Sequence, residues 1–99
     1  MFRRVKKVHF VGIGGIGMSG IAELLLNLGF DVSGSDITES PIIEKLIRLG
    51  ADVHMGHSVI NLTDADVLVY SSAVQKDNSE IQAAYEKNLP IIRRAEMLG

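Results

Sequence analysis

The chain alternates short apolar runs with longer amphipathic stretches. Residues 5–11 are apolar and β-branched and predict a buried strand, and shorter strands are predicted at 30–33, 51–54, 67–70 and 90–92. Between several of them, apolar residues recur every three or four positions, which predicts helices over 17–28 and 41–49 and a third helix that starts near residue 78. Strands and helices that alternate in this way are typical of a parallel sheet with crossover helices.

The predicted fold is therefore an α/β, Rossmann-like three-layer domain with a parallel five-stranded sheet. Right-handed crossovers favour the strand order 3-2-1-4-5. Local signals support the helix boundaries. Ser40 followed by Pro41 is typical of a helix start, and Gly29 is placed to end the first helix. Asp77 and Glu80 resemble a capping box at the start of the third helix, which would turn Ile81, Ala84 and Tyr85 inward.

Length and composition fit one small globular domain. The chain has 99 residues, of which 46% are hydrophobic and 22% charged, and no cysteine. Disulfides and thiolate metal sites are thus excluded, and we expect a cytoplasmic location. The last residues, RRAEMLG at 93–99, start another helical pattern. We therefore expect residues 1–99 to be one domain of a longer protein.

Charge gives no sign of a polyanionic partner. Ten basic and twelve acidic residues give a net charge of −2, with no long run of either sign. We expect no nucleic-acid partner and no membrane partner. No apolar stretch approaches the roughly 20 residues that a membrane-spanning helix needs.

A glycine-rich turn between the first strand and the first helix is the clearest chemical signal. The sequence GIGGIGMSG at 12–20 contains Gly12, Gly14 and Gly17 at the spacing of the dinucleotide-binding fingerprint. In that fingerprint the first glycine permits a tight turn, the second lets a pyrophosphate approach the backbone, and the third lets the helix pack closely. Free N–H groups and the helix dipole then favour an anion. The pattern predicts a phosphate site, although no P-loop for an ATP γ-phosphate is present.

Asp36 is the second marker of a nucleotide site. It ends the second predicted strand, at close to the usual spacing of about 20 residues after the first glycine. A carboxylate there accepts hydrogen bonds from ribose hydroxyls and repels the 2′-phosphate of NADP. The alternative is a residue that only forms a turn or caps a helix. Isolated histidines carry less weight: His9 is best explained as a satisfied core or sheet-end residue, and His54 and His57 as loop residues rather than ligands.

Two features differ from an ordinary NAD domain. Gly15 is an additional glycine in the loop, and Ser71, Ser72 and Ala73 place hydroxyls and bare backbone after the fourth strand. No partner for a nicotinamide is visible, and neither a catalytic triad nor a metal-ligand spacing is readable.

Six segments together carry a family resemblance. HFVGIGGIGMSGIAELL, VSGSD, GADVHMGHS, VLVYSSAV, NSEIQAA and IIRRAEML resemble, in order and spacing, the N-terminal domain of the Mur ligases. The resemblance is to the branch of the family that adds L-alanine to UDP-N-acetylmuramate in peptidoglycan synthesis. It covers the whole chain and implies a three-domain enzyme in which this domain holds the UDP part of the substrate. The remaining domains would bind ATP and Mg²⁺, so this chain alone would bind its substrate without catalysing ligation.

The resemblance also implies which residues bind the substrate, and none of them is catalytic or a metal ligand. The pyrophosphate would be met by the glycine loop, at Gly12, Gly14, Gly15, Ile16, Gly17 and Met18. The uridine and ribose would be met by residues that follow the strands: Ser35, Asp36, Ile37, Gly56, His57, Ser71, Ser72 and Ala73.

Two other functions remain open from the residues. One is the NAD-binding domain of a dehydrogenase, and the other is a regulatory domain that senses a nucleotide. Both would use the same glycine loop.

Overall fold

The computed structural model describes residues 5–15, 17–58, 64–71, 74 and 77–93. Within these ranges the chain forms one five-stranded sheet of β1 (Lys7–Val11), β2 (Asp31–Asp36), β3 (Asp52–Met55), β4 (Val67–Tyr70) and β5 (Ile91–Arg93). The strand order is β3-β2-β1-β4-β5, and each neighbouring pair is parallel. The predicted fold class and strand order are confirmed.

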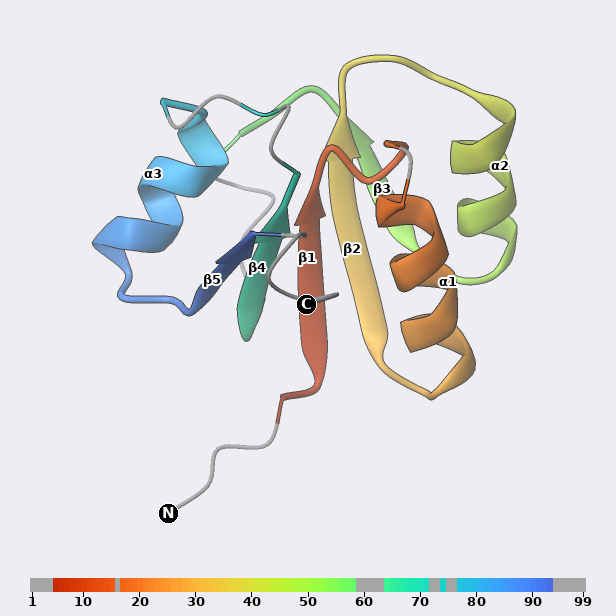
Figure 1. Ribbon diagram of the computed structural model, residues 1–99, viewed down its shortest axis with the longest axis horizontal. Helices are drawn as coiled ribbons and strands as arrows, with labels where there is room; N and C mark the ends of the chain where they lie inside the picture. The colour runs from red at the N-terminus through yellow and green to blue at the C-terminus, as the bar shows by residue number, and fades with distance from the viewer. Residues whose placement is uncertain (1–4, 16, 59–63, 72–73, 75–76, 94–99) are drawn as a thin grey trace.

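In the described part of the chain, three helices cover the two faces of the sheet. Helices α1 (Met18–Asn27) and α2 (Pro41–Arg48) lie on one side, and α3 (Ser79–Glu86) lies on the other (Figure 1). The result is the expected three-layer arrangement. Among the described residues, every helix is too short or too polar to cross a lipid bilayer.

Strand β1 shows how the core divides between the two faces. Its side chains alternate, as in any strand. Val8 and Phe10 are buried in the cluster that contains α1 and α2, whereas Val11 is buried in the cluster that contains α3. His9 lies on the α3 side of the sheet, where its side chain contacts Glu80. Both faces of the central strand are therefore covered, as its apolar sequence requires.

The glycine loop after β1 rests directly on β2. The amides of Gly12 and Ile13 both donate to the carbonyl of Ser35, at 2.8 and 3.1 Å. A Cβ on Gly34 would lie 2.6 Å from Cδ1 of Ile13, so only glycine at this position lets the loop approach the strand. This contact fixes the loop over the carboxyl ends of the strands.

Helix boundaries follow the sequence signals with one correction. Ser40 caps α2, since its hydroxyl accepts a hydrogen bond from the amide of Ile43, and Gly29 follows α1 with a φ of 94°. The capping box with Asp77 was wrong. The cap of α3 is Asn78, whose side chain accepts from the amide of Glu80. The chain enters the helix one residue later than expected.

The buried face of α3 also differs from the one predicted from the sequence. Ile81 and Ala84 are buried as expected, but Tyr85 is 56% exposed and Glu80 is fully buried. The final helical pattern lies at 94–99, outside the described residues.

Candidate functional site

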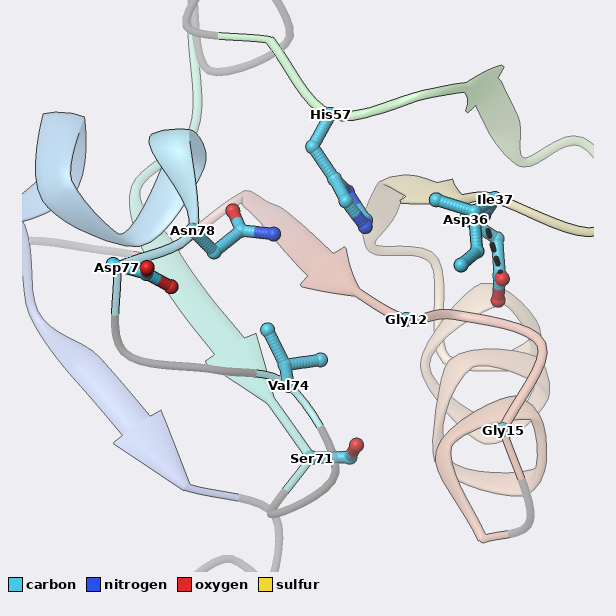
Figure 2. A pocket seen from close by; sticks show the side chains of 9 residues that line it. All are labelled: Gly12, Gly15, Asp36, Ile37, His57, Ser71, Val74, Asp77 and Asn78. Atoms are coloured by element: carbon cyan, nitrogen blue, oxygen red, sulfur yellow. Dashed lines mark hydrogen bonds between the residues drawn. The ribbon is translucent and has the colours of Figure 1, made fainter.

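A cleft of about 440 Å³ opens at the carboxyl ends of the strands, within the size range of small-molecule sites. Its walls come from the loop after β1, the end of β2, the segments that follow β3 and β4, and the start of α3 (Figure 2). The lining residues are Gly12, Gly15, Asp36, Ile37, His57, Ser71, Val74, Asp77 and Asn78. Segments distant in the sequence thus meet at one edge, where α/β sheets bind their ligands.

The cleft includes only part of the set predicted from the sequence. The predicted residues that line it are Gly12, Gly15, Asp36, Ile37, His57 and Ser71. Met18 and Ser35 have fully buried side chains, so a ligand would reach neither side chain directly. Ile16, Ser72 and Ala73 lie outside the described residues. The direct contacts of all these residues with a ligand stay predictions.

Most described amides of the glycine loop already have an acceptor, either in β2 or within the loop. Gly14 donates to Oδ2 of Asp36 at 2.8 Å, Gly15 donates to the carbonyl of Gly12, and Met18 donates to the carbonyl of Gly15. The amide of Gly17 has no acceptor among the residues that the structure describes. With a φ of 84°, Gly17 is the residue before α1, and it offers that helix no side-chain cap. Fewer loop amides are therefore available to an anion at the positive end of α1 than the glycine pattern suggested.

Asp36 has the structural role that the sequence left open as an alternative. Its Oδ2 accepts from Gly14, while its Oδ1 accepts from the amides of Ile37 at 2.8 Å and Thr38 at 3.3 Å. Asp36 thus braces both the glycine loop and its own turn. Its carboxylate also lines the cleft, and Oδ2, which accepts only from Gly14, can accept one further hydrogen bond there.

Sequence reasoning missed the wall formed by Val74, Asp77 and Asn78. Helix α3 begins at the cleft, so the residues before it are brought to the same edge as the glycine loop (Figure 2). The usable signal was topological. In a parallel sheet, the residues between the end of a strand and the start of its crossover helix all lie at the carboxyl edge.

A chain of buried polar groups lies directly under the cleft. His9 bonds Ser33 through Nδ1 at 2.7 Å and Glu80 through Nε2 at 2.8 Å. Glu80 also accepts from the hydroxyl of Ser35 at 2.7 Å, and that hydroxyl bonds Nδ1 of His57 at 2.7 Å. His9 is thus the satisfied core residue that was predicted. Of these hydrogen-bonded residues, His57 is the one that lines the cleft.

The described residues do not fit ATP with Mg²⁺. No group of three or more His, Cys, Asp or Glu side chains in the described part of the chain could hold a metal ion. The glycine loop also lacks the lysine of a P-loop. What the site offers is a concave surface with a helix terminus, backbone amides and a few polar side chains.

This sheet, loop and cleft define the class of Rossmann-like α/β domains with a ligand cleft at the carboxyl edge. The chain belongs to the Mur ligase family: the family described as "Mur ligase family, catalytic domain" matches residues 7–99. The match decides between the alternatives that the residue pattern left open.

Two curated relatives are alanine-adding ligases of this family. The chain is 61% identical over 99 residues to the UDP-N-acetylmuramate–L-alanine ligase of Oleidesulfovibrio alaskensis, and 60% identical to that of Syntrophus aciditrophicus. It covers 22% and 21% of those proteins, so it spans about a fifth of their length.

Two crystal structures of ligases share the fold. The UDP-N-acetylmuramate-alanine ligase of Thermotoga maritima matches with a TM-score of 0.90 and 40% identity, over 96% of this chain and 22% of that protein. A UDP-N-acetylmuramate:L-alanyl-γ-D-glutamyl-meso-diaminopimelate ligase of Neisseria meningitides matches with a TM-score of 0.84 and 33% identity, over 96% of this chain and 30% of that protein. The resemblance to the N-terminal domain of the alanine-adding Mur ligases is thereby confirmed.

Proposed function

We propose that the chain is the substrate-binding domain of a ligase that joins L-alanine to UDP-N-acetylmuramate, and that its cleft holds the UDP part. The observation that carries the proposal is the cleft itself. It brings the glycine loop, Asp36 and His57 to one place, in a chain 61% identical to a ligase of that name.

Each part of UDP has a chemically suitable surface in the cleft. The pyrophosphate would lie at the amide of Gly17 and the positive end of α1. Gly12 and Gly15 line the neighbouring wall without side chains, which leaves room for phosphate oxygens. A ribose hydroxyl would donate to the remaining acceptor position on Oδ2 of Asp36, and the base would lie toward His57 and Asn78.

ATP and Mg²⁺ belong to the same proposal but not to this cleft. Since the described residues do not fit them, we place their site in other domains of the complete ligase. The task of this chain would be to bind and orient the muramyl substrate, so that its carboxylate is presented to the chemistry elsewhere. We expect the chain alone to bind UDP compounds and to show no ligase activity.

Calorimetry with UDP, UDP-N-acetylmuramate, NAD and ATP tests the proposal. We expect both UDP compounds to bind and NAD to give no measurable heat. The binding should be weak, because the other domains would bury much of the ligand. Tighter binding of NAD than of UDP would overturn the assignment.

A further inference from the structure

Glu80 is a buried acid that substrate binding does not directly use. Its side chain is fully buried at the start of α3, and donors from several parts of the chain surround it. Oε1 accepts from the hydroxyl of Ser35 at 2.7 Å and from Nε2 of His9 at 2.8 Å, while Oε2 accepts from the amide of Ser58 at 2.9 Å. A carboxylate with this many donors is held as an acceptor.

This arrangement fixes the tautomer of His57. A serine hydroxyl has one hydrogen, and that of Ser35 is donated to Glu80. The Ser35 oxygen can then only accept from Nδ1 of His57, at 2.7 Å. The neutral ring of His57 therefore carries its hydrogen on Nδ1, which leaves Nε2 as an acceptor. Nε2 has no partner among the described residues, and the ring lines the cleft.

The backbone amide of Glu80 fixes the orientation of the Asn78 carboxamide. The amide of Glu80 donates to Oδ1 of Asn78 at 2.8 Å, so the other end of that carboxamide is the NH₂ donor. Asn78 lines the cleft together with His57, and Figure 2 shows both side chains directed into it from neighbouring walls. The cleft therefore presents one fixed acceptor and one fixed donor.

We propose that Ser35 and Glu80 are positioning residues that make this wall select a nucleobase with an imide edge. Such an edge offers an N–H to Nε2 of His57 and a neighbouring carbonyl oxygen to the NH₂ of Asn78. Uracil has this edge. Cytosine reverses it, because its ring nitrogen is an acceptor and its exocyclic amine is a donor. The inference rests on the proposed function, since it needs a nucleotide base in the cleft.

The tautomer can be measured without any ligand. The chain has three histidines, so the ring nitrogens of a ¹⁵N-labelled sample can be assigned by NMR. We expect Nδ1 of His57 to give the shift of a protonated nitrogen and Nε2 that of an unprotonated one. The reverse pattern in the parent chain overturns the inference.

Two serine variants separate positioning from general structure. Ser35→Ala removes the hydroxyl that bridges His57 and Glu80 and leaves Nδ1 of His57 3.9 Å from Oε2 of Glu80, beyond hydrogen-bond distance. We expect His57 to shift toward the Nε2–H tautomer. Ser33→Ala is the matched control. Ser33 is equally buried on the same strand, but its hydroxyl bonds His9 rather than His57. The control should keep the Nδ1–H tautomer, and an unchanged tautomer in Ser35→Ala overturns the role of Ser35.

A comparison of UDP with CDP tests the selectivity. The two ligands share ribose and diphosphate and differ only in the base. We expect the parent chain to prefer UDP by at least about tenfold, the scale of one or two hydrogen bonds, and Ser35→Ala to lose most of that preference. Equal binding of UDP and CDP overturns this inference but leaves the proposed function standing. If neither ligand binds, the proposed function itself fails. The NMR experiment tests the tautomer of His57 independently of that result.

Discussion

Oδ2 of Asp36 accepts a hydrogen bond from the amide of Gly14 at 2.8 Å, which ties the end of β2 to the glycine loop. The other oxygen, Oδ1, holds the turn that follows, at Ile37 and Thr38. An acid that the sequence suggests for ribose binding therefore also shapes the loop that would bind phosphate. Substitutions at Asp36 should alter stability before they say anything about a ligand.

Asp36→Asn should destabilise the fold. An asparagine has a single side-chain oxygen, so its NH₂ group would face either the amide of Gly14 or those of Ile37 and Thr38. Leaving a donor opposite a donor should lower the free energy of unfolding by about 1–3 kcal/mol. Urea denaturation followed by circular dichroism measures the change.

The control for this variant is Asp31→Asn, on the same strand. Asp31 is an exposed residue at the opposite end of β2, so its substitution should change the unfolding free energy by less than about 0.5 kcal/mol. Equal stability of the Asp36 and Asp31 variants would contradict a bracing role for Asp36.

Gly14→Ala should also destabilise the fold, for a steric reason. A Cβ at Gly14 would lie 3.0 Å from Oδ2 of Asp36 and 3.0 Å from Cδ1 of Ile43. Overpacking of this kind costs about 1–3 kcal/mol. Gly20→Ala makes the matched comparison, because nothing lies within 4 Å of its Cβ position and the residue is inside α1. That variant should gain up to about 1 kcal/mol from helix propensity. Thermal unfolding of both variants gives the sign of each effect, and a stabilised Gly14→Ala chain would show that the contact yields without cost.

The fold could be predicted because its signals are periodic and local. The central strands β1 and β4 are short stretches with several apolar, β-branched residues, and Ser40 and Gly29 act within their own turns. The errors arose where tertiary contacts decide. Glu80 has the polarity of a surface residue, yet it is buried because His9, Ser35 and Ser58 supply donors from elsewhere in the chain. No window of sequence around Glu80 contains that information.

The candidate site was predictable to a similar extent. The glycine loop and Asp36 were found because their spacing reports the end of a strand. The sequence could not reveal the close approach of Ile43 to Gly14, because this contact depends on how α2 packs against the loop. Asn78 was missed as a wall of the cleft because its neighbour Asp77 also fits the pattern of a helix cap.

Ser40→Ala should weaken α2 by removing its cap. The Ser40 hydroxyl accepts from the amide of Ile43 at 3.3 Å, and Pro41 begins the helix directly after it. Loss of such a cap costs about 1 kcal/mol. Ser40→Asp provides the rescue, because a carboxylate can accept the same hydrogen bond and also favours the helix dipole. Denaturant unfolding should rank the parent and the Asp variant together above the Ala variant. An Ala variant as stable as the parent would mean that solvent replaces the cap.

Ile37→Ala should weaken UDP binding while leaving stability unchanged. Ile37 lines the cleft, yet 76% of its surface is exposed, so its side chain contributes little to the core. A ligand in the cleft would cover part of this apolar surface, and losing that contact should reduce affinity about three- to tenfold, or roughly 1 kcal/mol. Leu24→Ala is the control, because Leu24 is also exposed, at 56%, but lies on α1 and does not line the cleft. Calorimetry with UDP measures the affinities, and urea denaturation checks that both variants keep the parent stability. If both variants bound UDP as the parent does, the ligand would not contact Ile37. If both lost affinity equally, the effect would not come from the cleft.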